Sequence, residues 1–130
     1  MIKKTVTYTT FDDETITEEF YFHFNKVELT ELQMSVDGGY LKMLERVLGS
    51  KDERTIMKVI KEFVLKAYGE KTLDGKRFDK SDEISNKFLH SAAFPVIFEE
   101  ITASADAITA FIKGTFPANT VDTSALKPAT

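Results

Sequence analysis

The chain has 130 residues, enough for one ordinary domain, and its net charge is −4 with no cysteine. The lack of cysteine excludes disulfides, thiolate zinc sites and cysteine nucleophiles. Because lysine and arginine are mixed with acidic residues in every segment, we expect no direct binding to nucleic acid. The N-terminus lacks the apolar run of a secretory signal, and no segment approaches the roughly 20 apolar residues that span a bilayer. We therefore expect a soluble intracellular protein that does not bind membranes.

Residues 3–24 are predicted to form an antiparallel β-hairpin with a turn at Phe11–Glu14. Alternation along the second strand places on one face the apolar residues Ile16, Phe20, Phe22 and Phe24, and on the other Thr17, Glu19, Tyr21 and His23. Two strands alone are marginally stable in water, so we expect helices to cover the phenylalanine face.

Residues 26–113 are predicted to form five to six helices. The first begins with a capping box at Asn25 and Glu28 and runs to about residue 36, and the second spans about residues 40–48. The third has the clearest apolar stripe. It is predicted to open with a second capping box, at Ser50 and Glu53, and to end at Gly69 in a left-handed conformation.

The segment 70–80 breaks the helical periodicity and is predicted to be a surface loop or a small hairpin, with Leu73 and Phe78 tucked inward. Ser81, Ser91 and Ser104 are each expected to begin one of the remaining helices. Residues 118–130 are small, polar and proline-containing, and we predict a flexible tail. Strands followed by helices indicate the α+β class, with a single domain over residues 1–117.

No residue pattern predicts catalysis, a cofactor or a metal. Neither His23 nor His90 has a second nitrogen or sulfur ligand at metal spacing. The acidic runs at 12–14 and 99–100 are expected on solvated surfaces, where burial does not shift a carboxylate pKa. The glycine-containing turns match no phosphate-binding loop, and the helix-capping serines have a structural role. We therefore predict that the chain is not an enzyme and that it acts by binding other polypeptides.

A family resemblance is carried by the hairpin, by the start of the first helix and above all by residues 68–81. The matching stretches are Lys3–Tyr8, Glu18–Phe22, Asn25–Leu29, Gly38–Gly39, Tyr68–Lys71, Asp74–Phe78 and Lys80–Ser81, followed by Phe88, Phe94, Glu99–Glu100, Ala110–Ile112, Gly114 and Pro117. In these stretches the sequence resembles the tail assembly chaperones of long-tailed phages (siphoviruses) and prophages of Gram-positive bacteria.

The resemblance implies that the chain binds the long, helical tape measure protein, keeps it soluble and helps tail tube subunits assemble around it. It implies work in the host cell cytoplasm, absence from the mature virion and a chain that forms homo-oligomers. Such chaperones are often made in two forms by a ribosomal frameshift, and these 130 residues would be the short form.

Two alternatives stay open: a structural tail or connector component of the virion, and a small phage protein that binds a host protein. Our candidate partner-binding residues lie on the outer hairpin face and in the 70–80 segment: Thr17, Tyr21, His23, Lys76, Arg77 and Phe78. The competing interpretation is that Phe78 belongs to the core and that the other five are only solvated.

Overall fold

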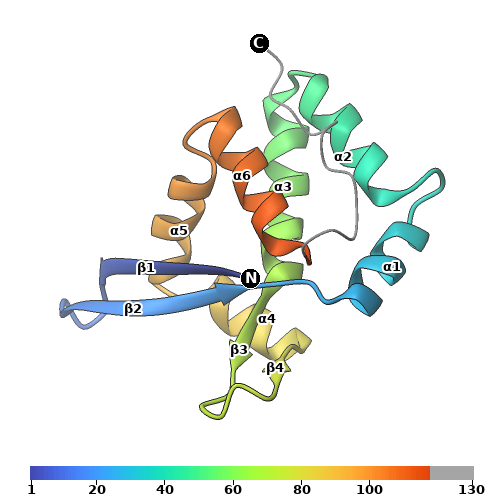
Figure 1. Ribbon diagram of the computed structural model, residues 1–130. Coiled ribbons are helices and arrows are strands. Elements are labelled where there is room, and N and C mark those ends of the chain that lie inside the picture. Colours follow the sequence, from blue (N-terminus) through green and yellow to red (C-terminus); the bar gives the residue numbers. More distant parts are fainter. Residues whose placement is uncertain (118–130) are drawn as a thin grey trace.

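The computed structural model describes residues 1–117, and the tail predicted to be flexible, residues 118–130, lies outside them (Figure 1). Two strands come first, β1 (Ile2–Thr9) and β2 (Thr15–Phe22), followed by α1 (Lys26–Met34), α2 (Tyr40–Gly49) and α3 (Glu53–Ala67). Two short strands, β3 (Tyr68–Lys71) and β4 (Phe78–Asp79), then precede α4 (Asp82–Leu89), α5 (Ala93–Ile101) and α6 (Ala105–Thr115). The predicted α+β class, the N-terminal hairpin and the helical remainder are confirmed.

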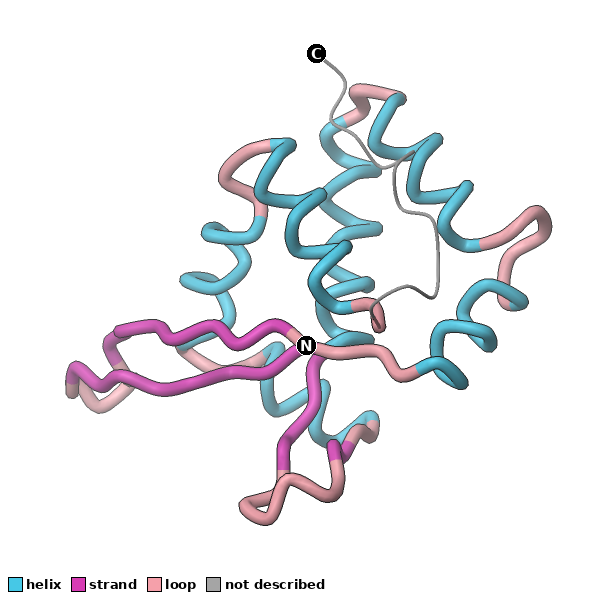
Figure 2. Tube along the Cα trace, viewed as in Figure 1, coloured by secondary structure: helices cyan, strands magenta, loops and turns pink. Residues whose placement is uncertain are grey.

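The four strands form one antiparallel sheet in the order β1-β2-β3-β4. β1 pairs with β2 along its whole length, whereas β3 pairs with β2 only at Tyr21↔Gly69 and Phe22↔Tyr68. The segment 70–80 is therefore a small hairpin, and it extends the sheet at one end. Because the pairing is so short, the two hairpins leave their junction in different directions, as the magenta segments of Figure 2 show.

The apolar face of the hairpin packs on the helices, as the alternation predicts. Phe22 is fully buried, and its ring centroid lies 5.2 Å from that of Phe111 in α6 and 5.7 Å from that of Phe88 in α4. The Tyr68 ring stacks on Phe88 at 4.0 Å. Buried residues from both long strands and from the six helices belong to one apolar cluster. The single domain over residues 1–117 stays a prediction.

The linker after β2 is fixed by main-chain hydrogen bonds to distant parts of the chain. The N–H of His23 donates to the carbonyl oxygen of Ala67 at 2.9 Å, and the N–H of Phe24 donates to that of Thr115 at 2.8 Å. The end of the first hairpin is therefore held between the last residue of α3 and the last residue of α6.

The predicted helix starts are right at three positions. Asn25 Oδ1 accepts from the N–H of Glu28, and Glu28 Oε1 accepts from the N–H of Asn25, which completes the predicted capping box. Ser81 and Ser104 cap α4 and α6 through their hydroxyl oxygens. These caps satisfy N–H groups that have no partner inside the helix.

Two of the predicted helix starts are wrong. Ser50 does not cap α3, because it lies at the end of α2 and its hydroxyl donates to the carbonyl oxygen of Val47; the N-cap of α3 is Asp52. Ser91 does not begin α5, because its hydroxyl donates to the carbonyl oxygen of Phe88 at the end of α4. In both cases the serine closes the preceding helix and does not open the next one.

Gly69 is not the left-handed helix cap that the sequence predicts. The chain passes directly from α3 into β3, and Gly69 lies within that strand. A Cβ atom at Gly69 would lie 2.6 Å from the Phe78 ring and 2.9 Å from the carbonyl oxygen of Asp79. The glycine therefore allows β4 to approach β3 closely, and no positive φ is involved.

Candidate partner-binding surfaces

The outer face of the first hairpin is polar and internally hydrogen-bonded. The hydroxyls of Thr7 and Thr17 lie 2.8 Å apart across the two strands. The Tyr21 hydroxyl donates to Glu19 Oε2 at 2.7 Å, which raises the pKa of the phenol and lowers the pKa of the Glu19 carboxyl. Lys3, 3.6 Å from Glu19, lowers that carboxyl pKa further. Thr17 and Tyr21 are thus held in fixed positions on an accessible surface.

His23 is less accessible than the alternation predicts. Its ring lies edge-on to the ring of Phe78, with the centroids 6.3 Å apart, and its Nδ1 atom is buried without a hydrogen-bond partner among residues 1–117. Burial lowers the pKa of the imidazole, and the positive charges of the N-terminus and Lys80 lower it further. The sequence did not show this contact because it depends on β4 joining the sheet.

The six candidate residues do not form one surface. The pairings Tyr21↔Gly69 and Lys71↔Phe78 place Tyr21 and Phe78 on the same face of the sheet, where Thr17 also lies. Phe78 is half-buried on this outer face, against His23, and is not part of the apolar cluster that forms the core. Lys76 and Arg77 lie instead in the loop of the second hairpin, and Arg77 Nε is 3.3 Å from Asp79 Oδ1.

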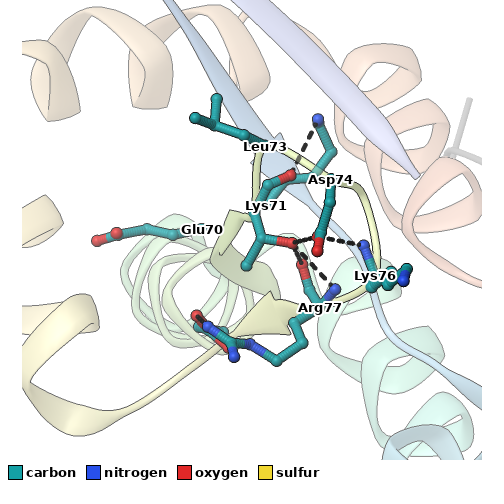
Figure 3. Close-up of a pocket in the computed structure, with 8 residues that line it drawn as sticks. Glu70, Lys71, Leu73, Asp74, Lys76 and Arg77 are labelled. Atoms are coloured by element: carbon teal, nitrogen blue, oxygen red, sulfur yellow. Dashed lines mark hydrogen bonds and ion pairs between the residues drawn. The ribbon is translucent and has the colours of Figure 1, made fainter.

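The second hairpin and its loop line an open, solvent-exposed hollow of about 690 Å³ (Figure 3). Thr72 organises this loop: its hydroxyl donates to Asp74 Oδ1 at 2.6 Å and accepts from the N–H of Arg77 at 3.2 Å. Asp74 Oδ1 also accepts from the N–H of Lys76, and these bonds, led by that of Thr72, lower the pKa of Asp74. The carboxylate of Asp74, one of three that border the hollow together with those of Glu70 and Asp79, therefore stabilises the loop.

Leu73 is fully exposed, so the prediction that it is tucked inward is wrong. The hydrogen bonds of Thr72 close the turn tightly after β3, and the Leu73 side chain points away from the loop in Figure 3. Local turn geometry thus outweighs the tendency of a leucine to be buried.

Sequence reasoning missed an apolar stripe on α1. Leu29 and Leu32 are buried, whereas Val27 and Met34, seven positions apart, are 67% and 79% exposed. Residues seven apart lie on the same side of a helix, so this side of α1 faces solvent with two large apolar side chains. Apolar residues on both sides of a short helix were a signal available in the sequence.

Among residues 1–117, no three histidine or acidic side chains gather where they could hold a metal ion. In the same part of the chain, no helix has both the length and the apolar character needed to cross a bilayer.

Ordered surfaces that display large apolar side chains are typical of a protein that binds other proteins. The chain belongs to a family of such proteins, because the model of the family described as phage tail assembly chaperone matches residues 1–127. No curated protein and no solved structure matches the chain significantly. The protein is therefore a phage tail assembly chaperone, and its partners are tail proteins.

Proposed function

We propose that this chaperone binds the tape measure protein of a long-tailed phage or prophage of Gram-positive bacteria, keeps it soluble and assists assembly of the tail tube, without catalysis. The observation that carries the proposal is the exposed pair Val27 and Met34 on α1. A long helical client aggregates through its apolar stripe unless another apolar surface covers that stripe.

The geometry of α1 suits a helical client. An apolar pair at a spacing of seven recurs after two helical turns, which is the repeat by which one helix packs along another. Thr30 and Glu31 lie on the turn between the two apolar residues, on the same side of α1, and are also exposed, so the surface consists of two apolar side chains separated by a polar turn. A client helix with its own apolar stripe can therefore lie along this side of α1.

The position of α1 is fixed before any client arrives. The capping box at Asn25 and Glu28 orders its first turn, and the Glu28 carboxylate also pairs with Lys80 at 2.8 Å. A surface that is already ordered loses little conformational entropy on binding.

Each contact is small, because burying one large apolar side chain contributes only about 1.5–3 kcal/mol. We propose that many copies act together on one client, so that weak contacts add up to a stable coat. Self-association of the chain, work in the host cytoplasm and absence from the finished virion are parts of this proposal.

The outer sheet face and the second hairpin are a second proposed contact with the client or with the tail tube protein. It comprises the residues chosen from the sequence: Thr17, Tyr21, His23, Lys76, Arg77 and Phe78. The support is that Thr17 and Tyr21 are ordered by hydrogen bonds on an accessible surface. Half-buried His23 and Phe78 would act by shaping that surface.

The test is co-expression with the tape measure protein, followed by measurement of the soluble fraction of the client. We expect the wild-type chain to keep the client soluble and the variant Val27→Ser/Met34→Ser to lose most of this effect. Met57→Ser/Val96→Ser removes the same residue types from other helices, where they are 37% and 39% exposed, and should act like wild type. Equal solubility with both variants would refute the role of α1, and no effect of the wild-type chain would refute the function.

Mass spectrometry of purified virions separates the proposal from its main alternative. A chaperone that leaves before the tail is complete should be absent, whereas a structural tail or connector component should be present in fixed copy number. If the chain co-purified with a host protein and not with tail proteins, this would favour the second alternative, a small phage protein that binds a host protein.

A further inference from the structure

The tip of the first hairpin, residues 10–14, combines an exposed aromatic ring with concentrated negative charge. Phe11 is 83% exposed. Asp12, Asp13 and Glu14 follow it directly, and none of their carboxylates forms an ion pair within residues 1–117. We call this segment the acidic tip.

The acidic tip is ordered by one threonine. The Thr10 hydroxyl oxygen accepts from the N–H groups of Asp12 and Glu14, and the Thr10 main chain bonds with both Asp13 and Glu14. Asp13 has a positive φ of 62°, a conformation that aspartate tolerates better than most residues. Phe11 is therefore held in water by a well-defined turn.

The end of the second hairpin, residues 71–77, has the opposite charge; it comprises Lys71, the last residue of β3, and the loop 72–77, and we call it the basic loop. It contains Lys71, Lys76 and Arg77 against Asp74 alone. The Arg77 guanidinium pairs with Asp79. Within residues 1–117 the ammonium groups of Lys71 and Lys76 form no ion pair within 4 Å, although that of Lys71 lies 5.5 Å from the centroid of the Tyr21 ring. Glu70 and Asp79 also border the 690 Å³ hollow, but Asp79 is paired with Arg77 and Asp74 accepts the hydrogen bonds of the loop. With fully exposed Leu73, this basic loop therefore offers an apolar contact beside the ammonium groups of Lys71 and Lys76.

The acidic tip and the basic loop of one molecule cannot meet. Figure 2 shows the first hairpin extending to the left and the second hairpin pointing down from their common junction. The two surfaces are complementary in charge, each carries an exposed apolar side chain, and each is ordered. A second copy of the chain supplies the matching surface.

We propose that copies of this chain join head to tail, with the acidic tip of one copy seated against the basic loop of the next. Phe11 then lies beside Leu73, and the carboxylates of Asp12 and Glu14 face the ammonium groups of Lys71 and Lys76. A contact between two different surfaces repeats from copy to copy, so it generates rings or open chains and not closed dimers. The inference rests on the self-association in the proposed function and gives it an interface.

The contact is small, so assembly requires high protein concentration. Charge attraction between exposed groups weakens as salt shortens the Debye length from about 30 Å at 0.01 M to about 8 Å at 0.15 M. In sedimentation velocity at low salt, the mean mass of the wild-type chain should rise with concentration, and it should fall when salt is added.

A charge exchange between two variants tests the pairing directly. Asp12→Lys/Glu14→Lys has two positive surfaces, and Lys71→Glu/Lys76→Glu has two negative surfaces, so each variant alone should sediment as a monomer. Asp13 is left unchanged because of its positive φ. An equimolar mixture of the two variants restores attraction at every contact between unlike copies, so it should assemble at the protein concentration at which the wild-type chain assembles.

Glu45→Lys/Glu99→Lys is the matched control, because it changes the net charge as much as the first variant does but at exposed helix positions. This control should assemble like wild type. The variant Phe11→Ser, which removes the exposed ring, should assemble only at a severalfold higher protein concentration than wild type. Circular dichroism verifies that each variant is folded. A monomeric wild-type chain at low salt, variants that assemble alone, or a mixture that stays monomeric would overturn the interface. These experiments contain no client, so such a result would refute the interface between copies and would not refute client binding, which the co-expression experiment tests.

Discussion

Lys80 Nζ lies 2.8 Å from Glu28 Oε2, and this ion pair joins the end of the second hairpin to the first turn of α1. The same ammonium group donates to the carbonyl oxygen of His23 at 2.6 Å and lies 4.4 Å from the centroid of the Phe24 ring. Burial lowers the pKa of Lys80, while the bond to Glu28 acts in the opposite direction. One cation thus connects β4, the linker and α1.

Replacing Lys80 by methionine should destabilise the fold, because it leaves the His23 carbonyl oxygen and the Glu28 carboxylate without their partner. We expect the free energy of unfolding in urea to fall by about 1.5–3 kcal/mol, the usual range for a hydrogen bond to a charged group. Lys87→Met is the control, because the Lys87–Glu83 pair is exposed on α4. Its loss should change stability by less than about 0.5 kcal/mol. Equal effects of the two substitutions would contradict the role of Lys80.

Gly69→Ala should destabilise the protein by about 1–3 kcal/mol, the range for forcing extra volume into a packed site. The added methyl group would overlap the Phe78 ring and the Asp79 carbonyl oxygen. Gly49→Ala adds the same group in α2, where no atom lies within 4 Å, and should be neutral or slightly stabilising. Phe78→Leu should restore only part of the stability of Gly69→Ala, since the carbonyl oxygen stays in place. Chemical denaturation measures all three effects, and full stability of Gly69→Ala would disprove the close approach.

His23 should make the folded state less stable in mild acid. Its folded-state pKa lies below the reference value of 6.5, so the folded chain binds fewer protons than the unfolded chain as the pH falls below that value. Its stabilising contribution is complete above pH 6.5 and is lost as the pH drops through the folded-state pKa. His23→Leu should therefore flatten the decline in unfolding free energy between about pH 7 and 5. An NMR titration giving a His23 pKa at or above 6.5 would refute this.

The outer sheet face can be tested separately from α1. Tyr21→Ala removes an ordered aromatic ring from the proposed second contact, and truncating such a residue at an interface commonly weakens binding by more than about 1 kcal/mol. We expect a loss of roughly tenfold in affinity for a tape measure fragment, measured by fluorescence anisotropy. Glu45→Ala, at an exposed position on α2 away from the sheet, is the control and should bind like wild type. Unchanged affinity for Tyr21→Ala would remove the sheet face from the binding surface.

Much of the fold could be predicted because the signals are local. Period-two alternation of large aromatic residues defined β2, and Asn25 with Glu28 marked the start of α1 three residues apart. The failures have a different origin. Gly69 follows a helix in the sequence as a capping glycine does, but its role depends on Phe78, which comes close only in the folded sheet. Ser50 lies between two helices, and the sequence pattern alone did not show which of them it caps.

The candidate surfaces were harder to predict than the fold. Phe11 and Leu73 are apolar residues in turns, and only the hydrogen bonds of Thr10 and Thr72 explain why both stay in water. The opposite charges of the two hairpins are visible in the sequence, but the directions in which the hairpins point are not.

The main-chain bond between Phe24 and Thr115 has a consequence for synthesis of the chain. The ribosome releases residue 24 long before residue 115, so the buried face of the first hairpin, which α4 and α5 also cover, is completely covered only after α6 has emerged. Contacts between such distant positions form late, and the exposed phenylalanines of an unfinished chain are prone to aggregate. The completed fold is therefore reached only after α6 has emerged from the ribosome, when neighbouring nascent chains on the same messenger already display their own uncovered hairpins.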